Sequence, residues 1–286
     1  MANLIVNADD FGLTSGINRA IVELHAAGLL TSTTLMARAG ASAQAIEIAS
    51  STPTLGVGCH VVLVDGEPIL SAREIPSLID PATGRLYSEL SAFLPRLFAG
   101  RIRPAEIQAE TAAQIAHLHS RGVQLTHIDT HKHTHMFPTV LRPVLRAARA
   151  AGIRAVRNPF EPPWSIRAAR DPAWVRVVQV TALSTLAPAC RRIIAGEGLA
   201  TTDGTIAVVS TGTFDAATLR ALLAALPAGT WELVTHPGYN DADLDCVHTR
   251  LRASRDVERQ ALAALREFPA VHLIDFAGVA SSQQSG

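Results

Sequence analysis

Short apolar runs alternate with helical patterns along almost the whole chain, and this alternation restricts the fold more than any other feature. The runs expected to form strands are 4–6, 33–36, 55–61, 124–129, 155–157, 206–209, 231–235 and 271–274. Helical patterns lie between most of them, for example over 15–28, 104–121, 138–151, 215–226 and 248–267. Such alternation predicts an α/β fold with a parallel sheet. Seven or eight units in 286 residues favour one (β/α)-barrel domain over two doubly wound halves. No glycine-rich dinucleotide fingerprint follows the first run, which weakens the doubly wound alternative further.

Three segments depart from the alternation. Residues 64–100 are irregular and contain four prolines, so we expect an insertion after the third strand. Residues 160–200 carry Trp164, Trp174 and several aliphatic residues, interrupted by arginines. That segment is either an amphipathic helix on the barrel or an apolar lid that contacts a lipid substrate or a membrane surface. Residues 281–286 are expected to form a frayed tail.

The composition narrows the functional classes. The net charge is zero, so no basic face is expected and nucleic acid is excluded as a partner. The cysteines at 59, 190 and 246 provide neither a disulfide framework nor a zinc-ribbon spacing. The sequence has no signal-peptide pattern and no apolar run of membrane-spanning length, so we expect a cytoplasmic protein. Nothing in the composition indicates an oligomeric state.

The segment Thr126–His135 contains four of the eleven histidines, at 127, 131, 133 and 135. Imidazole is the commonest metal ligand and transfers protons near neutral pH. In a helix, His127, His131 and His135 would share a face; in an extended chain, all the odd positions would. We favour a strand that ends in a loop, because nine residues are long for a barrel strand. A metal with an open position takes three protein ligands, so the other histidines and Asp129 are expected to orient ligands or contact substrate.

Further polar residues lie at other strand ends. Asp9 and Asp10 follow the first strand, His60 ends the third, and His236 ends the strand over 231–235. Because a barrel gathers its strand ends on one rim, we expect these groups to converge there. The acids could instead cap the next helix. As neighbours in an extended segment they would point opposite ways, unless the chain turns near Phe11 and Gly12. His236 is either an incidental turn residue or a general acid that faces a metal.

Several enzyme classes lack support. The chain has no Gly-x-Ser-x-Gly elbow, no His-Glu-x-x-His helix and no Walker loop, which argues against serine hydrolases, zincins and kinases. Cys59 adjoins His60, but neighbours on a strand face opposite sides, so Cys59 is expected to be a small buried residue. From the residues alone, the pattern indicates metal-assisted hydrolysis.

Four motifs together resemble the YdjC-like carbohydrate deacetylases, which include chitooligosaccharide deacetylases. The motifs are Asn7–Gly12, Gly58–His60, Thr126–His135 and Thr235–Gly238, within a resemblance that runs from about 3 to 275. The resemblance implies a distorted (β/α) barrel and a divalent metal. Matched position by position, it implies that Asp10, His60 and His131 bind the metal. It also implies that Asp9 is the general base and His236 the general acid.

A narrower resemblance concerns the hopanoid-biosynthesis-associated branch of this family, HpnK. It rests on Val62–Leu70 with Ile75–Leu78, on His131–Leu141, and on Ala155–Arg157 before Glu161. It implies removal of the N-acetyl group from a glucosamine on a hopanoid lipid, in the cytoplasm or at the inner membrane surface. Two alternatives remain: a deacetylase of soluble chitooligosaccharides such as diacetylchitobiose, and a non-catalytic metal- or carbohydrate-binding protein. An acid and a base flanking a metal argue against the second.

The implied ligand set also bears on the metal. Two imidazoles and one carboxylate suit zinc better than magnesium, which prefers oxygen ligands. The family is nonetheless often described with magnesium. We expect zinc, with magnesium as the alternative.

Overall fold

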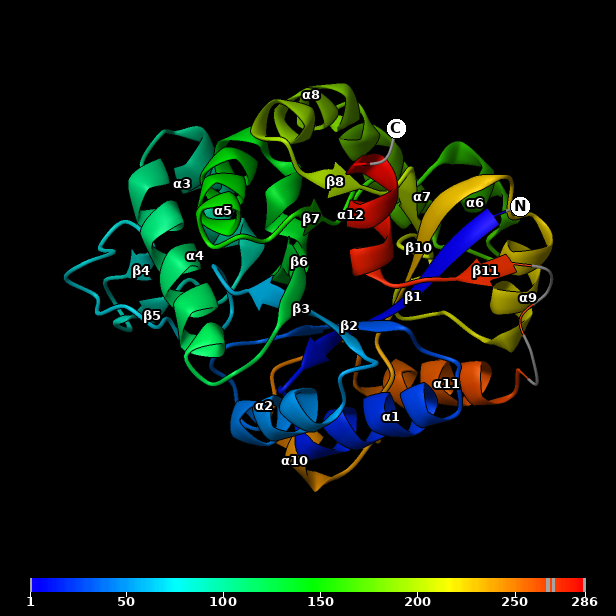
Figure 1. The fold of residues 1–286 in the computed structure, drawn as a ribbon. Helices are drawn as coiled ribbons and strands as arrows, with labels where there is room; N and C mark the ends of the chain where they lie inside the picture. The colour runs from blue at the N-terminus through cyan, green and yellow to red at the C-terminus, as the bar shows by residue number, and fades with distance from the viewer. Residues whose placement is uncertain (1, 266–267, 269–270, 285–286) are drawn as a thin grey trace.

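β1 (Ala2–Phe11) lies inside a curled sheet whose strands all run parallel to their neighbours. The computed structural model describes residues 2–265, 268 and 271–284 (Figure 1). The strand order is β8-β7-β6-β3-β2-β1-β10-β9, and β11 pairs with the start of β1. The other strands are β2 (Ser32–Leu35), β3 (Gly56–Val61), β6 (Leu125–Thr130), β7 (Ala155–Val156), β8 (Ala200–Thr201), β9 (Gly204–Ile206), β10 (Gly229–Thr235) and β11 (Val271–Leu273). The predicted α/β class and distorted barrel are confirmed.

The barrel closes through the chain rather than through a strand ladder. The edge strands β8 and β9 are separated in sequence by only Thr202 and Asp203. The Asn158 side chain donates hydrogen bonds to the carbonyl oxygens of both linking residues. The Thr205 amide of β9 donates to the Phe160 carbonyl after β7. The two edges of the sheet are therefore held together by side-chain and loop contacts, which explains the distortion.

Alternation along each strand separates an inner from an outer layer of side chains. In β1, Leu4, Val6 and Ala8 join the main hydrophobic core, whereas Ile5 joins a small cluster with Ala155, Ala200 and α12 (Phe276–Gln284). Those three residues lie at the starts of β1, β7 and β8. α12 therefore fills the amino-terminal end of the barrel, and the carboxyl-terminal end is left for polar groups.

The helices lie around the sheet (Figure 1). They are α1 (Ser15–Ala26), α2 (Ser42–Ser51), α3 (Leu90–Phe98), α4 (Pro104–His119), α5 (Pro138–Ala150), α6 (Pro163–Ala168), α7 (Trp174–Ser184), α8 (Ala187–Glu197), α9 (Ala216–Ala224), α10 (Ala242–Asp245) and α11 (Arg252–Ala263). None of the helices described is long and apolar enough to cross a bilayer.

Sequence and structure differ in several boundaries. The first strand is longer than predicted, so Asp9 and Asp10 belong to β1 rather than to the loop after it. β9 ends at Ile206, because Ala207 has a φ of 72°, which stops strand pairing before Val208. The segment 64–100 contains the antiparallel pair β4 (Ile79–Asp80) and β5 (Arg85–Leu86), then α3.

The segment 160–200 folds into three helices, α6 to α8, rather than one. Positions 281–284 of the predicted frayed tail continue α12, and positions 285–286 lie outside the described residues.

Candidate active site

The backbone turns at Asp10, and this turn gives neighbouring carboxylates access to one cavity. Asp10 has a φ of 65°, and the pairing of β1 with β2 shifts register between Ala8 and Phe11. A non-glycine residue in this region is strained, and such strain concentrates at functional sites. Both Asp9 and Asp10 are buried and line the cavity. The helix-cap alternative is wrong, because Thr14 caps α1 by accepting from the Ile17 amide.

Three potential metal-ligand atoms form a nearly equilateral triangle. His60 Nε2 lies 3.5 Å from Asp10 Oδ1, His131 Nδ1 lies 3.3 Å from the same oxygen, and the two nitrogens are 3.2 Å apart. Ligand atoms about 2.1 Å from a tetrahedral zinc ion are about 3.4 Å apart. The donor set therefore fits one divalent ion and leaves a fourth position for another ligand.

A carboxylate behind His60 fixes its orientation. Asp129 Oδ1 lies 2.8 Å from His60 Nδ1, the arrangement that directs the other ring nitrogen to a metal. Burial lowers the pKa of His60, but the charges of Asp129, Asp9 and Asp10 outweigh it and raise that pKa to about 9. The negative charges that stabilise a proton on this imidazole would also stabilise a metal cation at the site.

Asp9 is held by a buried arginine. Arg157 Nη2 donates to Asp9 Oδ1 at 2.6 Å, and Arg157 Nη1 donates to Oδ2 at 2.8 Å. The same guanidinium also contacts Asp129 and Glu232. Burial acts to raise the pKa of Asp9, yet Arg157 holds that pKa far below its usual value. Burial raises the pKa of Glu232 to about 7, despite the same arginine.

His236 lies beside Asp9. Its Nε2 is 3.8 Å from Asp9 Oδ2, its Nδ1 is 3.7 Å from Glu258 Oε2, and its amide donates to the same Glu258 oxygen. Burial lowers the pKa of His236, but the Glu258 carboxylate and the Asp9 charge raise it above its ordinary value. His236 therefore keeps its proton to a higher pH than a free imidazole does.

Asp10 also has an arginine partner. Arg255 Nη2 donates to Asp10 Oδ2, while Asp10 Oδ1 faces His60 and His131. Burial acts to raise the pKa of Asp10, but Arg255 and the two imidazoles hold that pKa well below its usual range. Arg255 and Glu258 both come from α11 and are only 1% exposed.

The histidines of the segment 127–135 lie at different depths in the barrel. His127 lies two residues, or about 6.6 Å, below Asp129 along β6. Its ring stacks on Phe276 at 3.9 Å, and a Cβ on Gly58 would meet that ring at 2.5 Å. Burial lowers the pKa of His127 to about 3. His127 thus lies one layer below the candidate metal ligands, at the floor of the barrel.

The remaining histidines follow β6 in a short 3-10 segment, His131–Met136. Lys132 and His133 have φ angles of 55° and 51°, so the chain turns sharply after His131. His133 lines the cavity, whereas His135 lies within hydrogen-bonding distance of Thr130. The predicted strand end running into a loop is therefore close to what is observed.

Trp164 does not line the cavity, in contrast to the prediction that it contacts substrate. Its indole packs edge-to-face on Trp231, with ring centroids 5.2 Å apart. Cys59 is fully buried in the core, as predicted.

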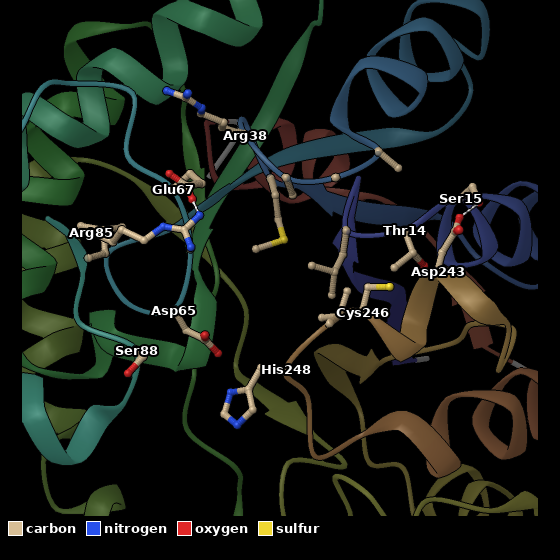
Figure 2. A pocket seen from close by; sticks show the side chains of 18 residues that line it. Thr14, Ser15, Arg38, Asp65, Glu67, Arg85, Ser88, Asp243, Cys246 and His248 are labelled. Atoms are coloured by element: carbon tan, nitrogen blue, oxygen red, sulfur yellow. Dashed lines mark hydrogen bonds and ion pairs between the residues drawn. The ribbon is translucent and has the colours of Figure 1, made fainter. Parts of the chain in front are cut away.

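The cavity above the candidate metal ligands has a volume of about 460 Å³. A second compartment of about 640 Å³ adjoins it and shares Leu13, Met36, Asp65, Val247 and His248. Figure 2 shows the charged side chains Arg38, Glu67 and Arg85 on one side of this compartment and Thr14, Ser15 and Asp243 on the other. The two compartments therefore adjoin each other, and each has polar and apolar residues in its lining.

Sequence reasoning missed the charged residues beneath and beside the site. Arg157 and Glu232 interrupt or end buried strands, and a charge in such a strand is itself a signal of pairing. Arg255 and Glu258 lie on the same helical stripe as the buried Leu262, which was a weaker signal.

Comparisons with known proteins identify relatives of this chain. A family model described as YdjC-like protein matches residues 3–268. A carbohydrate deacetylase of Brevibacillus brevis is 40% identical over 161 residues, which span 56% of this chain and 59% of that protein. A carbohydrate deacetylase of Thermoanaerobacter pseudethanolicus is 28% identical over 92% of this chain and 91% of its own length. A crystal structure of a proposed cellobiose-phosphate cleavage protein from Enterococcus faecalis V583 is 25% identical. It covers 97% of this chain and 98% of its own, with a TM-score of 0.71. The chain belongs to the family of YdjC-like proteins.

Proposed function

We propose that this protein is a metal-dependent carbohydrate deacetylase that hydrolyses the N-acetyl group of an N-acetylglucosamine unit. The observation that carries the proposal is the triangle of Asp10, His60 and His131 with Asp9 and His236 beside it. The relatives named carbohydrate deacetylase support the same reaction. A divalent cation held by the triangle would polarise the acetamide carbonyl and lower the pKa of an attacking water.

The two proton transfers are assigned to Asp9 and His236. Arg157 keeps Asp9 ionised, so the Asp9 carboxylate is in the form that can accept the proton of the attacking water. His236, whose pKa is raised, donates a proton to the departing sugar amine. Asp129 keeps His60 in the tautomer that offers Nε2. The C–N bond breaks, and acetate and an amino sugar leave.

We expect zinc as the metal, because two imidazoles dominate the ligand set. Protein purified without added metal should contain about one zinc per chain by elemental analysis and release acetate from an acetylated amino sugar. A chelator should abolish acetate release, and added zinc should restore it. Protein that contains only magnesium would contradict the choice of zinc, and zinc-loaded protein that releases no acetate would favour the non-catalytic binding alternative.

As the specific substrate, we favour an N-acetylglucosaminyl hopanoid. The sequence resemblance to that branch is joined by one surface feature. Trp174, Val175 and Val178 on α7 are 76%, 46% and 58% exposed, and Ala173 and Arg176 beside them line the cavity. An exposed apolar helix face with flanking arginines suits a lipid surface or the lipid part of a substrate. Such a surface would present the sugar of a glycolipid to the site.

This surface predicts weak membrane binding. Trp174→Ala should reduce co-sedimentation with phosphatidylglycerol-containing vesicles several-fold, because it removes the largest exposed apolar side chain on α7. Phe98→Ala is the matched control, since Phe98 is also exposed, at 69%, but lies on α3. No vesicle binding by the parent protein, or equal losses in the two variants, would remove the membrane-contact proposal.

A soluble chitooligosaccharide is the second candidate substrate. The adjoining compartment favours it, because a cleft with polar and charged side chains beyond the first cavity could hold a further sugar unit. Acetate release from diacetylchitobiose and from an N-acetylglucosaminyl hopanoid, compared at equal concentrations, distinguishes the two. Faster turnover of diacetylchitobiose would replace the hopanoid proposal.

A further inference from the structure

Arg255 carries unused hydrogen-bond donors at the candidate active site. Its side chain is 1% exposed, lines the cavity and donates through Nη2 to Asp10 Oδ2. Its Nε and Nη1 atoms are buried and have no hydrogen-bond partner among the residues that the structure describes. Buried donors without partners are costly and therefore rare in native proteins. The guanidinium is positioned for a partner that the protein itself does not supply.

The other arginine of the site shows the contrast. Arg157 is equally buried, but Nε, Nη1 and Nη2 all donate to the carboxylates of Asp9, Asp129 and Glu232. The hydrogen-bond donor atoms of Arg157 therefore have their partners within the protein. Arg255 has one carboxylate partner, and Asp10 uses its remaining oxygen toward His60 and His131.

The backbone and the aliphatic stem of Arg255 pack against the turn after His236. The Gly238 amide donates to the Arg255 carbonyl at 3.2 Å. A Cβ on Gly238 would lie 2.9 Å from Ile17 Cγ1 and 3.3 Å from Arg255 Cδ, so a larger residue there would crowd both side chains. The turn after His236 thereby fixes both the proposed acid and Arg255. Donors held in this way lose little freedom when a ligand binds.

We propose that the free donors of Arg255 bind the acyl oxygen of the substrate and the carboxylate of the acetate product. Guanidinium groups donate and never accept, so the partner must carry oxygen acceptors. Acetate is the anion that the reaction creates, and charge-assisted hydrogen bonds to carboxylates are about twice as strong as neutral ones. This inference rests on the proposed deacetylase function and adds a specific contact to it.

The test measures acetate binding directly, by calorimetric titration of zinc-loaded protein with sodium acetate. We expect Arg255→Met to bind acetate about tenfold more weakly or worse. Arg255→Lys keeps a positive charge next to Asp10 but has fewer donors, so an intermediate loss is expected. Zinc content, measured on each variant, separates loss of the anion contact from loss of the metal. Arg250→Met is the matched control, since Arg250 lines the same cavity but is exposed.

Equal acetate affinity in the parent and both zinc-loaded Arg255 variants would overturn the inference, as would an equal loss in Arg250→Met. Acetate release from an acetylated sugar by the parent is measured separately. If that release occurs while acetate affinity is independent of Arg255, the proposed function stands and this inference fails. If no acetylated sugar is hydrolysed but acetate binding depends on Arg255, the proposed function fails and the anion contact stands.

Discussion

Arg157→Met is expected to destabilise the fold by about 3–5 kcal/mol at pH 7, because breaking a buried ion pair leaves the partner charges unpaired. Arg157 is fully buried and is the shared partner of Asp9, Asp129 and Glu232. Methionine fills a similar volume but offers none of the donors that these carboxylates accept. Urea unfolding followed by circular dichroism measures the loss. Arg146→Met, at a largely exposed side chain, should change stability by less than about 0.5 kcal/mol.

The pH dependence gives this prediction a second readout. In the parent, the pKa values of Asp9 and Asp129 are depressed, so their stabilising contribution is present above the unfolded value of 3.8 and is lost as pH falls below it. In Arg157→Met, burial without the arginine raises those pKa values above the unfolded ones. The variant therefore becomes relatively more stable as pH falls, and the difference from the parent shrinks toward pH 4. A variant as stable as the parent at pH 7 would contradict the assigned role of Arg157.

The barrel and the rim of polar residues were predictable because both follow from periodicity. Apolar runs separated by helical patterns imply parallel strands, and parallel strands bring Asp9, His60 and His236 to one end. The structure places these groups together as predicted. Burial of Cys59 followed in the same way from alternation along β3.

Periodicity could not predict how deep a residue lies in the barrel, which residue adopts a left-handed backbone conformation, or which residues a buried charge pairs with. His127 and Asp129 both face the interior, but only the register of β6 with β3 shows that His127 lies opposite Gly58, one layer below the site. The left-handed conformation of Asp10 depends on a register shift between β1 and β2, which local sequence does not encode strongly. Arg157 and Arg255 acquire partners from segments 148 and 245 residues away, so no local pattern pairs them.

Trp164 illustrates the same limit for substrate contacts. A tryptophan in a mixed apolar and basic segment fits a lid or a core equally well, and its packing on Trp231 of β10 decides for the core. Trp174, ten residues later, is exposed instead. Sequence composition predicted that the segment 160–200 is rich in apolar residues, but it could not predict which of them face the core and which face solvent.

Asp9→Asn is expected to lower kcat by at least about 100-fold while leaving the metal bound, since general-base catalysis contributes about 10²–10⁴-fold. The amide keeps the shape of the carboxylate but cannot accept the proton of the attacking water. Asp10, His60 and His131 are unchanged, so zinc content should match the parent. Asp65→Asn is the matched control: it makes the same chemical change in the same cavity, at a residue paired with Lys132 at 2.8 Å.

The comparison between these variants decides between catalysis and structure. Asp9→Asn also removes one carboxylate partner of Arg157, so its urea unfolding midpoint is expected to fall as well. A base role predicts that kcat is lost even under conditions where the zinc-loaded variant is fully folded by circular dichroism, while Asp65→Asn keeps most of its activity. Retained acetate release by zinc-loaded Asp9→Asn would place the base elsewhere. Asp10 would not be the replacement, because its Oδ1 belongs to the proposed metal-ligand triangle with His60 and His131.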